Sequence, residues 1–174
     1  MNSRFLTAIG LIAAIGSTTP AFAQDSGNRV AANTDWSVFV EDNPKDCWSV
    51  SAPKETVNTR DGNVVSARRG DILLFVSYRP EQNIRGQVSF TGGYPFAGGS
   101  TVSLNISGTT FELFTEGEWA WPATPEDDAK IIAAMKRGSE AVATARSSRG
   151  TTTKDTFSLL GFTATVEEAA KRCS

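Results

Sequence analysis

Short runs in which apolar and polar residues alternate dominate the chain after residue 35, and they predict β-strands. The alternation is strictest at 101–106 and 109–115, on either side of the Ser107-Gly108 dipeptide. Because successive side chains of a strand point to opposite faces of a sheet, these two runs predict a β-hairpin with one apolar face. Runs rich in β-branched and aromatic residues predict further strands at 36–40, 46–50, 71–78, 84–90, 118–121, 139–145 and from 151 onward.

Two regions of the chain depart from this alternation. The run DILLFVSY at 71–78 is the most apolar of the mature chain, and its length of eight favours a central strand that is buried on both faces. The preceding segment, 51–70, is polar and predicts a hairpin or loop that exposes the basic pair Arg68-Arg69 to solvent.

Only two segments predict helices. Thr124 is placed to cap the first, with Pro125 at its first position, acidic residues at 126–128 near the positive end of the dipole, and Gly138 as its stop. The second helix is expected to begin at Thr165, which forms a T-x-x-E capping box with Glu168. Its apolar positions then recur at helical spacing and include Cys173 on the inward face; they are Val166, Ala169, Ala170 and Cys173.

Eight or nine short strands with two helices predict an all-β sandwich or barrel with helical appendages. A lipocalin-like β-barrel is the alternative architecture. The length of the chain suits one domain, which we expect to occupy 35–174.

The N-terminus predicts export. Residues 1–23 combine a basic residue, an apolar run and the Ala21-Phe22-Ala23 pattern of a signal peptidase site, so cleavage is expected between Ala23 and Gln24. The apolar run is too short for a stable transmembrane anchor, which needs about 20 residues. Residues 24–34 are polar and predict a flexible leader. We therefore expect the protein in the periplasm or cell envelope.

Charge and cysteine usage restrict the partners and the compartment. The chain has 17 basic and 19 acidic residues, a formal charge of −2, which argues against a nucleic-acid partner. The two cysteines, Cys47 and Cys173, are expected to form a disulfide in an oxidising compartment, and closing a loop of 126 residues (173 − 47) would stabilise the fold by about 4–5 kcal/mol. Two free thiols or an intermolecular bridge are the alternatives.

The sequence offers no catalytic constellation. Without histidine, neither a Ser-His-Asp triad nor the commonest metal ligand is available, and two cysteines do not complete a zinc shell, so we predict no catalytic residues, no metal and no cofactor. Glu116 and Glu118, two residues apart around a turn, are the one acid pair considered for glycosidase chemistry. The plainer interpretation is two solvated charges at the end of a hairpin.

The run SRGTTTKDTFSLLGF at 148–162 contains the residue types of a phosphate-binding loop. Such a loop leads from a strand through glycines into a helix N-terminus, whereas here Gly150 precedes the threonines and Lys154 lacks the GK[ST] context. We therefore interpret 146–150 as a turn and the rest as the arm of a hairpin, with Phe157 and Leu159 in the core.

Tyr94-Pro95-Phe96, which lies between two glycine pairs, is the candidate interaction loop. Its aromatic rings either contact a partner or fold back over one end of the sandwich. Trp119 and Trp121 share a strand face by period two and are expected in the core or its lid.

Several stretches together resemble the invasion-associated locus B proteins of alphaproteobacteria. They are Gly93-Tyr94-Pro95-Phe96 with Gly99-Ser100, Phe111-Glu112-Leu113-Phe114, Ala120-Trp121, Ala134-Met135-Lys136-Arg137-Gly138, the block 148–163, and the two cysteines. The resemblance implies an exported protein with an immunoglobulin-like β-sandwich, linked in pathogenic relatives to host-cell invasion and without enzymatic activity. The function it implies is a binding or envelope-interaction module for an unknown protein or envelope polymer; the alternative is a carboxylate-based hydrolase acting on an envelope glycan. The oligomeric state does not follow from the sequence.

Overall fold

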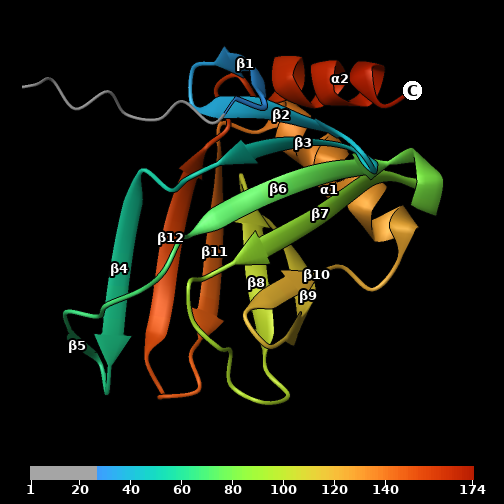
Figure 1. Ribbon diagram of the computed structural model, residues 1–174. Helices are drawn as coiled ribbons and strands as arrows, with labels where there is room; N and C mark the ends of the chain where they lie inside the picture. Colours follow the sequence, from blue (N-terminus) through green and yellow to red (C-terminus); the bar gives the residue numbers. More distant parts are fainter. Residues whose placement is uncertain (1–26) are drawn as a thin grey trace, which may run out of the picture.

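The computed structural model describes residues 27–174, so the predicted signal peptide and the cleavage site between Ala23 and Gln24 lie outside the described residues. Within them, twelve strands form one antiparallel sheet in the order β1-β2-β3-β6-β7-β10-β9-β8-β11-β12-β4-β5 (Figure 1). The first six strands are β1 (Arg29–Asn33), β2 (Trp36–Asp42), β3 (Lys45–Ser51), β4 (Glu55–Arg60), β5 (Asn63–Val64) and β6 (Leu73–Arg79). The others are β7 (Ile84–Thr91), β8 (Thr101–Ile106), β9 (Thr109–Glu116), β10 (Trp119–Trp121), β11 (Glu140–Arg146) and β12 (Thr152–Ser158).

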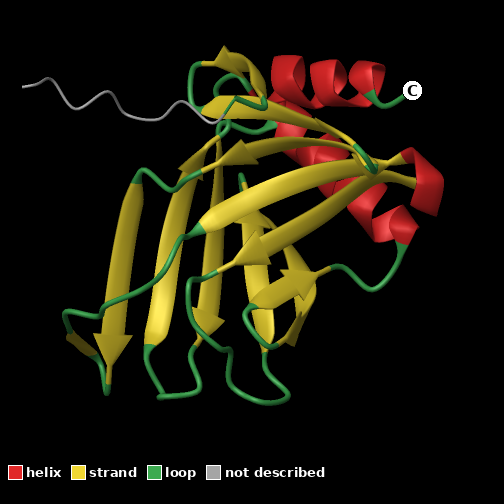
Figure 2. Cartoon of the chain, in the orientation of Figure 1, coloured by secondary structure: helices red, strands yellow, loops and turns green. Residues whose placement is uncertain are grey.

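The sheet folds over on itself to make two layers. Strands β2, β3, β6 and β7 lie in front of β8, β9, β11 and β12, and their directions cross steeply (Figures 1 and 2). The short strand β10 joins the layers, because it pairs with β7 on one side and with β9 on the other. The predicted all-β, sandwich-like class with two helices is confirmed. The described sheet ends at β1 and β5, so the closed lipocalin-like barrel is not the architecture found.

The core lies between the two layers. Apolar side chains from alternate positions of each layer meet there, among them Leu74, Val88 and Phe90 from the front layer and Leu104 and Phe157 from the back layer, all fully buried. The Phe90 and Phe157 rings meet edge to face at 6.1 Å between centroids. Burying such alternating side chains fixes the register of each strand.

Helix α1 (Pro125–Arg137) has the predicted start and stop. The Thr124 hydroxyl accepts a hydrogen bond from the Asp127 N–H at 3.2 Å, and Gly138 follows the last turn. Ile131 and Met135 pack into the core from this helix.

Helix α2 (Phe162–Arg172) begins three residues earlier than predicted, and the Thr165–Glu168 capping box is wrong. Gly161, at φ +91°, turns the chain so that Phe162 packs edge to face on Trp36 at 4.8 Å. Thr165 is consequently inside the helix, where its hydroxyl donates to backbone carbonyls and accepts from the Ser49 hydroxyl at 2.8 Å.

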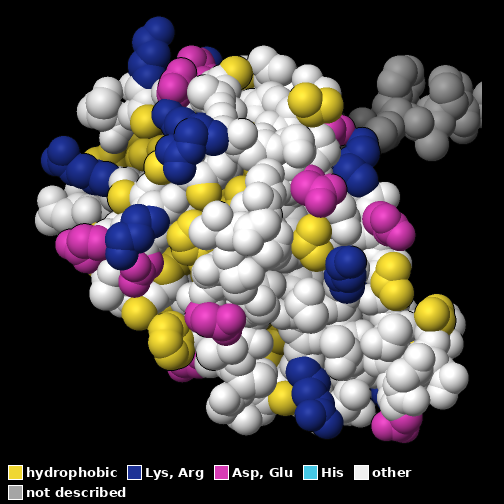
Figure 3. All heavy atoms as spheres, turned by 180° about the vertical axis from the view of Figure 1, so that it is seen from behind, with side chains coloured by type: hydrophobic (Ala, Val, Ile, Leu, Met, Phe, Trp, Pro, Cys, Tyr) yellow, Lys and Arg dark blue, Asp and Glu magenta, His cyan; other side chains and the backbone are white. Residues whose placement is uncertain are grey.

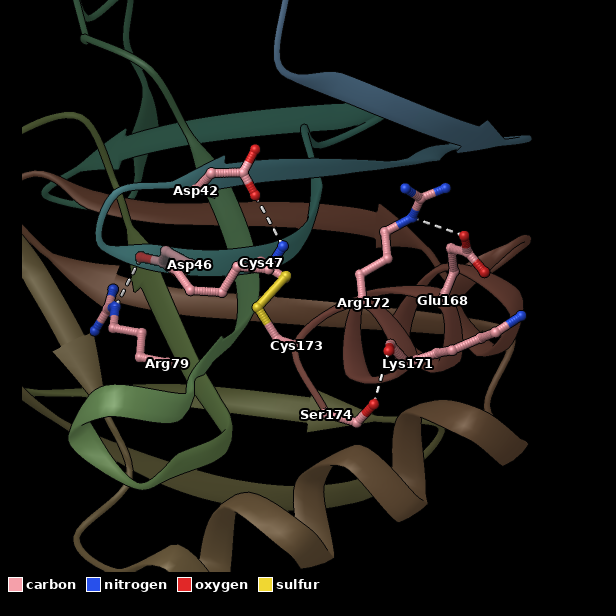
Figure 4. The surroundings of a disulfide bond; sticks show 10 residues. Asp42, Asp46, Cys47, Arg79, Glu168, Lys171, Arg172, Cys173 and Ser174 are labelled. Atoms are coloured by element: carbon pink, nitrogen blue, oxygen red, sulfur yellow. Dashed lines mark hydrogen bonds and ion pairs between the residues drawn. A yellow bond between two sulfur atoms is a disulfide. The ribbon is translucent and has the colours of Figure 1, made fainter.

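The predicted disulfide is present in the structure. Cys47 of β3 and Cys173 at the end of α2 are bonded, with their Cα atoms 5.9 Å apart (Figure 4). Cys47 lies in a small buried cluster with Val38 and Ala169, so the bond attaches α2 to β2 and β3.

Three expectations about β1, β6 and β10 are wrong. Arg29–Asn33 is not part of a flexible leader but forms β1, because its backbone pairs with β2 and Ala31 packs beside the disulfide cluster. The outer face of strand β6 is only partly buried: Leu74 and Val76 are fully buried, while Phe75 between them is partly exposed. On β10, similarly, Ala120 occupies the core and Trp119 is 43% exposed.

Candidate functional site

A cavity of about 410 Å³ opens among the loops at the end of the sandwich where β4 ends and β12 begins, the lower end in Figure 1. Its walls come from five segments that are far apart in the sequence: the end of β4, the segment 66–69, the loop after β7, the turn between β9 and β10, and the turn between β11 and β12. Four of its lining residues are arginines, namely Arg60, Arg68, Arg69 and Arg149. We call this cavity the arginine pocket.

Asp155, on the core side of β12, anchors the base of this pocket. Strand alternation turns Thr153, Asp155 and Phe157 to the same buried face. Arg69 meets the fully buried Asp155 carboxylate with two hydrogen bonds, from Nη1 to Oδ1 at 2.7 Å and from Nη2 to Oδ2 at 2.6 Å. Burial raises the pKa of Asp155, and the Arg69 guanidinium opposes this rise.

The remaining contacts of Arg69 connect three walls of the pocket. Its Nε donates to the Gly92 carbonyl at 2.8 Å, its Nη1 also reaches Asn58 Oδ1 at 3.3 Å, and its guanidinium lies over the Tyr94 ring at 5.0 Å. Arg69 is therefore occupied by the protein itself. Its role is to hold the pocket in shape.

The backbones of Gly70 and Gly93 touch behind this arginine. The Gly70 N–H donates to the Gly93 carbonyl at 2.9 Å, and a Cβ atom on Gly93, which has φ +71°, would lie 2.5 Å from the Gly70 carbonyl oxygen. Only glycine at position 93 allows this approach of the segment 66–70 to the loop after β7.

The candidate interaction loop folds back over the end of the sandwich. Phe96 is buried and packs against Phe90. Tyr94 is half buried, contacts the Phe96 ring edge to face at 5.3 Å, and shares a hydrogen bond with the Thr153 hydroxyl at 2.5 Å. Burial raises the pKa of Tyr94. Of the three residues Pro95 alone is well exposed, so a partner can reach this loop only through Pro95 and the Tyr94 surface that lines the pocket.

The run 148–162 forms the hairpin arm that the sequence predicts. β12 pairs with β11 along its whole length, and residues 147–151 make the turn. This turn also lines the arginine pocket, where the Ser148 N–H donates to the Pro95 carbonyl at 2.9 Å. Hydroxyl groups surround the cavity here, from Ser147, Ser148, Thr151 and Thr153.

The pocket is locally positive in a chain of net charge −2. Asp155 neutralises Arg69, which leaves Arg60, Arg68 and Arg149 against Glu118. Arg60 Nη2 donates to Thr151 Oγ1 at 2.7 Å, while Arg68 and Arg149 are exposed. On the face seen from behind, Lys and Arg are interspersed with Asp and Glu (Figure 3).

This combination of groups suits an anion. Arginine presents several N–H donors to a carboxylate or phosphate, and hydroxyls add further donors. The geometry does not gather an acid pair: both Glu116 and Glu118 are exposed, and of the two Glu118 alone lines the pocket. In residues 27–174 there is also no cluster of three metal-ligating side chains.

The sequence did not identify Arg69 or the pocket. Arg69 was expected on the solvated surface, because nothing near position 69 shows that its partner is 86 residues away. One local signal was available. Asp155 lies two residues before the core residue Phe157 on the same strand, so its carboxylate faces inward, and a buried carboxylate needs a cation beside it. The long-range pairing itself has no local signature.

Comparison with protein-family models matches residues 73–170 to the family described as "Invasion associated locus B (IalB) protein". The matched stretch runs from β6 into α2 and contains Tyr94, Pro95 and the 147–151 turn of the pocket. No curated protein and no solved structure matches the chain. Among the helices of residues 27–174, none has the length and apolar character needed to cross a membrane.

Proposed function

The chain belongs to the invasion-associated locus B family, and from this premise we propose that it is a non-enzymatic binding module exported to the periplasm or cell envelope. Its ligand is an anionic group carried by a protein or an envelope polymer, and its site is the arginine pocket. The observation that carries this proposal is the set of three arginines, 60, 68 and 149, that face the cavity with a single glutamate among them.

Two features support this compartment. Residues 1–23 have the pattern of a signal peptide, and the Cys47–Cys173 disulfide fits an oxidising environment outside the cytoplasm. In the pathogenic relatives that give the family its name, we propose that the contribution to host-cell invasion is adhesion or envelope organisation rather than catalysis. The pocket supports binding, because Arg69 and Asp155 neutralise each other and Glu118 has no second acid beside it to complete a hydrolytic pair.

The test is binding of the mature chain to soluble acidic polymers by calorimetry, at low and at physiological salt. The probes are polygalacturonate for carboxylates, heparin for sulfates and polyphosphate for phosphates. At least one should bind, more weakly at the higher salt concentration because salt screens the exposed arginines.

The decisive variant is Arg68→Gln/Arg149→Gln, which removes two exposed cations from the pocket. We expect it to lose at least about tenfold in affinity, which corresponds to about 1.4 kcal/mol. The matched control is Arg85→Gln/Arg137→Gln, which removes two exposed cations that do not line the pocket and should retain binding. Equal losses in both variants would mean that general charge, not the pocket, attracts the polymer, and no binding to any probe would refute the anionic ligand.

A further inference from the structure

The outer face of the front layer carries aromatic side chains, although a sheet face exposed to water is usually polar. The strand register places Phe39 opposite Trp48 and Trp48 opposite Ser77, so these side chains share one face. The same face continues through Phe75 of β6 to Trp119 of β10. Both helices pack on the opposite face, where Ser49 contacts α2 and Val88 contacts α1.

The aromatic rings on this face lie side by side in pairs. Phe39 stacks on Trp48 at 5.6 Å between centroids with an interplanar angle of 7°, and Phe75 lies 5.6 Å from Trp119. Between the pairs is a groove of about 190 Å³, lined by Trp48, Phe75 and Trp119 together with Glu41, Asp46 and Arg79. We call it the aromatic groove. It shares no lining residue with the arginine pocket.

One carboxylate oxygen of Asp46, which lines this groove, has no hydrogen-bond donor among the described residues. Asp46 Oδ2 accepts from Arg79 Nε at 2.9 Å (Figure 4), but Asp46 Oδ1 has no donor among residues 27–174 although it is shielded from solvent. A buried oxygen without a donor destabilises the protein, so a ligand that supplies one is favoured. The side chains of Arg79 and Asp46 are 36% and 21% exposed, so both are partly accessible from the groove that they line.

We propose that the aromatic groove binds one uncharged sugar ring of a glycan. A pyranose has an apolar face of C–H bonds, which are attracted by the negative faces of the Trp48 and Trp119 rings. Its hydroxyls donate to Asp46 and Glu41 and accept from Arg79. A purely aliphatic ligand would leave the Asp46 oxygen without a donor.

Size and charge narrow the ligand further. The groove volume is below the range of about 300–1,000 Å³ for drug-sized ligands, so it holds a group of about one ring. Two carboxylates face one guanidinium in this groove, which disfavours acidic sugars. The inference does not rest on the proposed function, because the aromatic groove shares no lining residue with the arginine pocket and takes an uncharged ligand.

The experiment titrates the mature chain with cellotetraose, maltotetraose and chitotetraose as neutral probes and with tetragalacturonic acid as the acidic one. Calorimetry gives the affinity, and tryptophan fluorescence reports the environment of Trp48 and Trp119. In Arg68→Gln/Arg149→Gln, whose arginine pocket has lost two cations, we expect at least one neutral probe to bind more tightly than the acidic one. Trp119→Ala should weaken that binding at least about tenfold, while Trp119→Tyr, which keeps an aromatic face, should stay within about threefold.

Two controls make the result specific. Phe114→Ala removes another aromatic ring, 54% exposed and outside the groove, and should bind as the wild type does. Arg68→Gln/Arg149→Gln should also bind normally, which separates this site from the arginine pocket. The proposal is wrong if no neutral probe binds, if the acidic probe binds more tightly in the Arg68→Gln/Arg149→Gln variant, or if Trp119→Ala binds unchanged. It is also wrong if Trp119→Ala alters only the sedimentation coefficient, since the face would then be a contact between copies of the chain.

Discussion

Arg69 and Asp155 form a bidentate ion pair whose carboxylate is fully buried and whose guanidinium is 6% exposed. Removing one partner of such a pair leaves an uncompensated buried charge, which typically costs about 3–5 kcal/mol. We therefore expect Arg69→Met to lower the free energy of unfolding by about this amount, measured by urea denaturation. Arg68→Met, at the neighbouring exposed position, should change it by less than about 0.5 kcal/mol.

The double variant Arg69→Met/Asp155→Leu tests the cause of that loss. Since it removes both charges and fills the space with apolar groups, it should recover most of the stability that Arg69→Met loses. A double variant as unstable as the single one would show that the contacts of Arg69 with Gly92 and Asn58, rather than the buried charge of Asp155, carry the effect.

The Cys47–Cys173 bond should stabilise the fold mainly by restricting the unfolded chain. Its sequence separation of 126 residues corresponds to about 4–5 kcal/mol in the chain-entropy account. We expect Cys47→Ser to lower the unfolding midpoint in oxidising buffer, and wild type and variant to differ little once a reductant is present. Cys173→Ser should cause the same loss, and combining the two substitutions should add nothing. Equal midpoints without reductant would contradict a stabilising bridge.

The elements with local signals were predictable from the sequence. The 101–115 hairpin follows from strict alternation around Ser107-Gly108, and α1 follows from Thr124, Pro125 and the acidic first turn. These features depend on residues within a few positions of one another. The alternation of side chains along a strand also identifies which residues share a face, but not which face is inward. Trp119 and Trp121 were therefore correctly placed on one face, but that face is not the one toward the core.

The features that were missed depend on contacts between distant segments. The start of α2 is set by Phe162 packing on Trp36, and β1 exists because β2 offers it a free edge. The arginine pocket needs five segments to meet. The sequence drew attention to the Tyr94-Pro95 loop, to Glu118 and to the 148–162 run, but to each for a different reason. Side-chain identity alone does not place these segments together.

Phe96 and Pro95 should respond to substitution in opposite ways. Phe96 is 7% exposed and contacts Phe90 and Tyr94, so Phe96→Ala should destabilise the fold by about 3–5 kcal/mol. Pro95 is exposed, and Pro95→Ala should cost less than about 1 kcal/mol. Thermal unfolding distinguishes the two. If Phe96→Ala unfolds like the wild type, the ring does not fill the core. Pro95→Ala is consequently the substitution suited to testing the loop in binding assays.

Asp128 should make stability depend on pH in the acidic range. Its Oδ1 accepts from the Val88 N–H at 2.7 Å on the inner side of α1, and burial, with the nearby Asp127 charge, raises its pKa to about 6 from 3.8. Because the folded state then binds more protons than the unfolded chain, the free energy of unfolding falls as pH rises from about 4 to about 6.

Asp128→Asn isolates this contribution, because the amide oxygen still accepts from Val88 and no longer titrates. We expect the variant to match or fall slightly below the wild type at about pH 4 and to be more stable at about pH 7. The gain in the free energy of unfolding over the wild type, from about pH 4 to about pH 7, is at most about 3 kcal/mol. Asp128 lines a groove with Gln87 and Trp121, and water in this groove reduces the gain. Urea denaturation of both proteins at several pH values measures their difference in the free energy of unfolding. The contributions of all other carboxyl groups are the same in both proteins and cancel in this difference. A constant difference across this range would show that Asp128 titrates like an exposed aspartate, and that the Val88 hydrogen bond and the α1 dipole offset its burial completely.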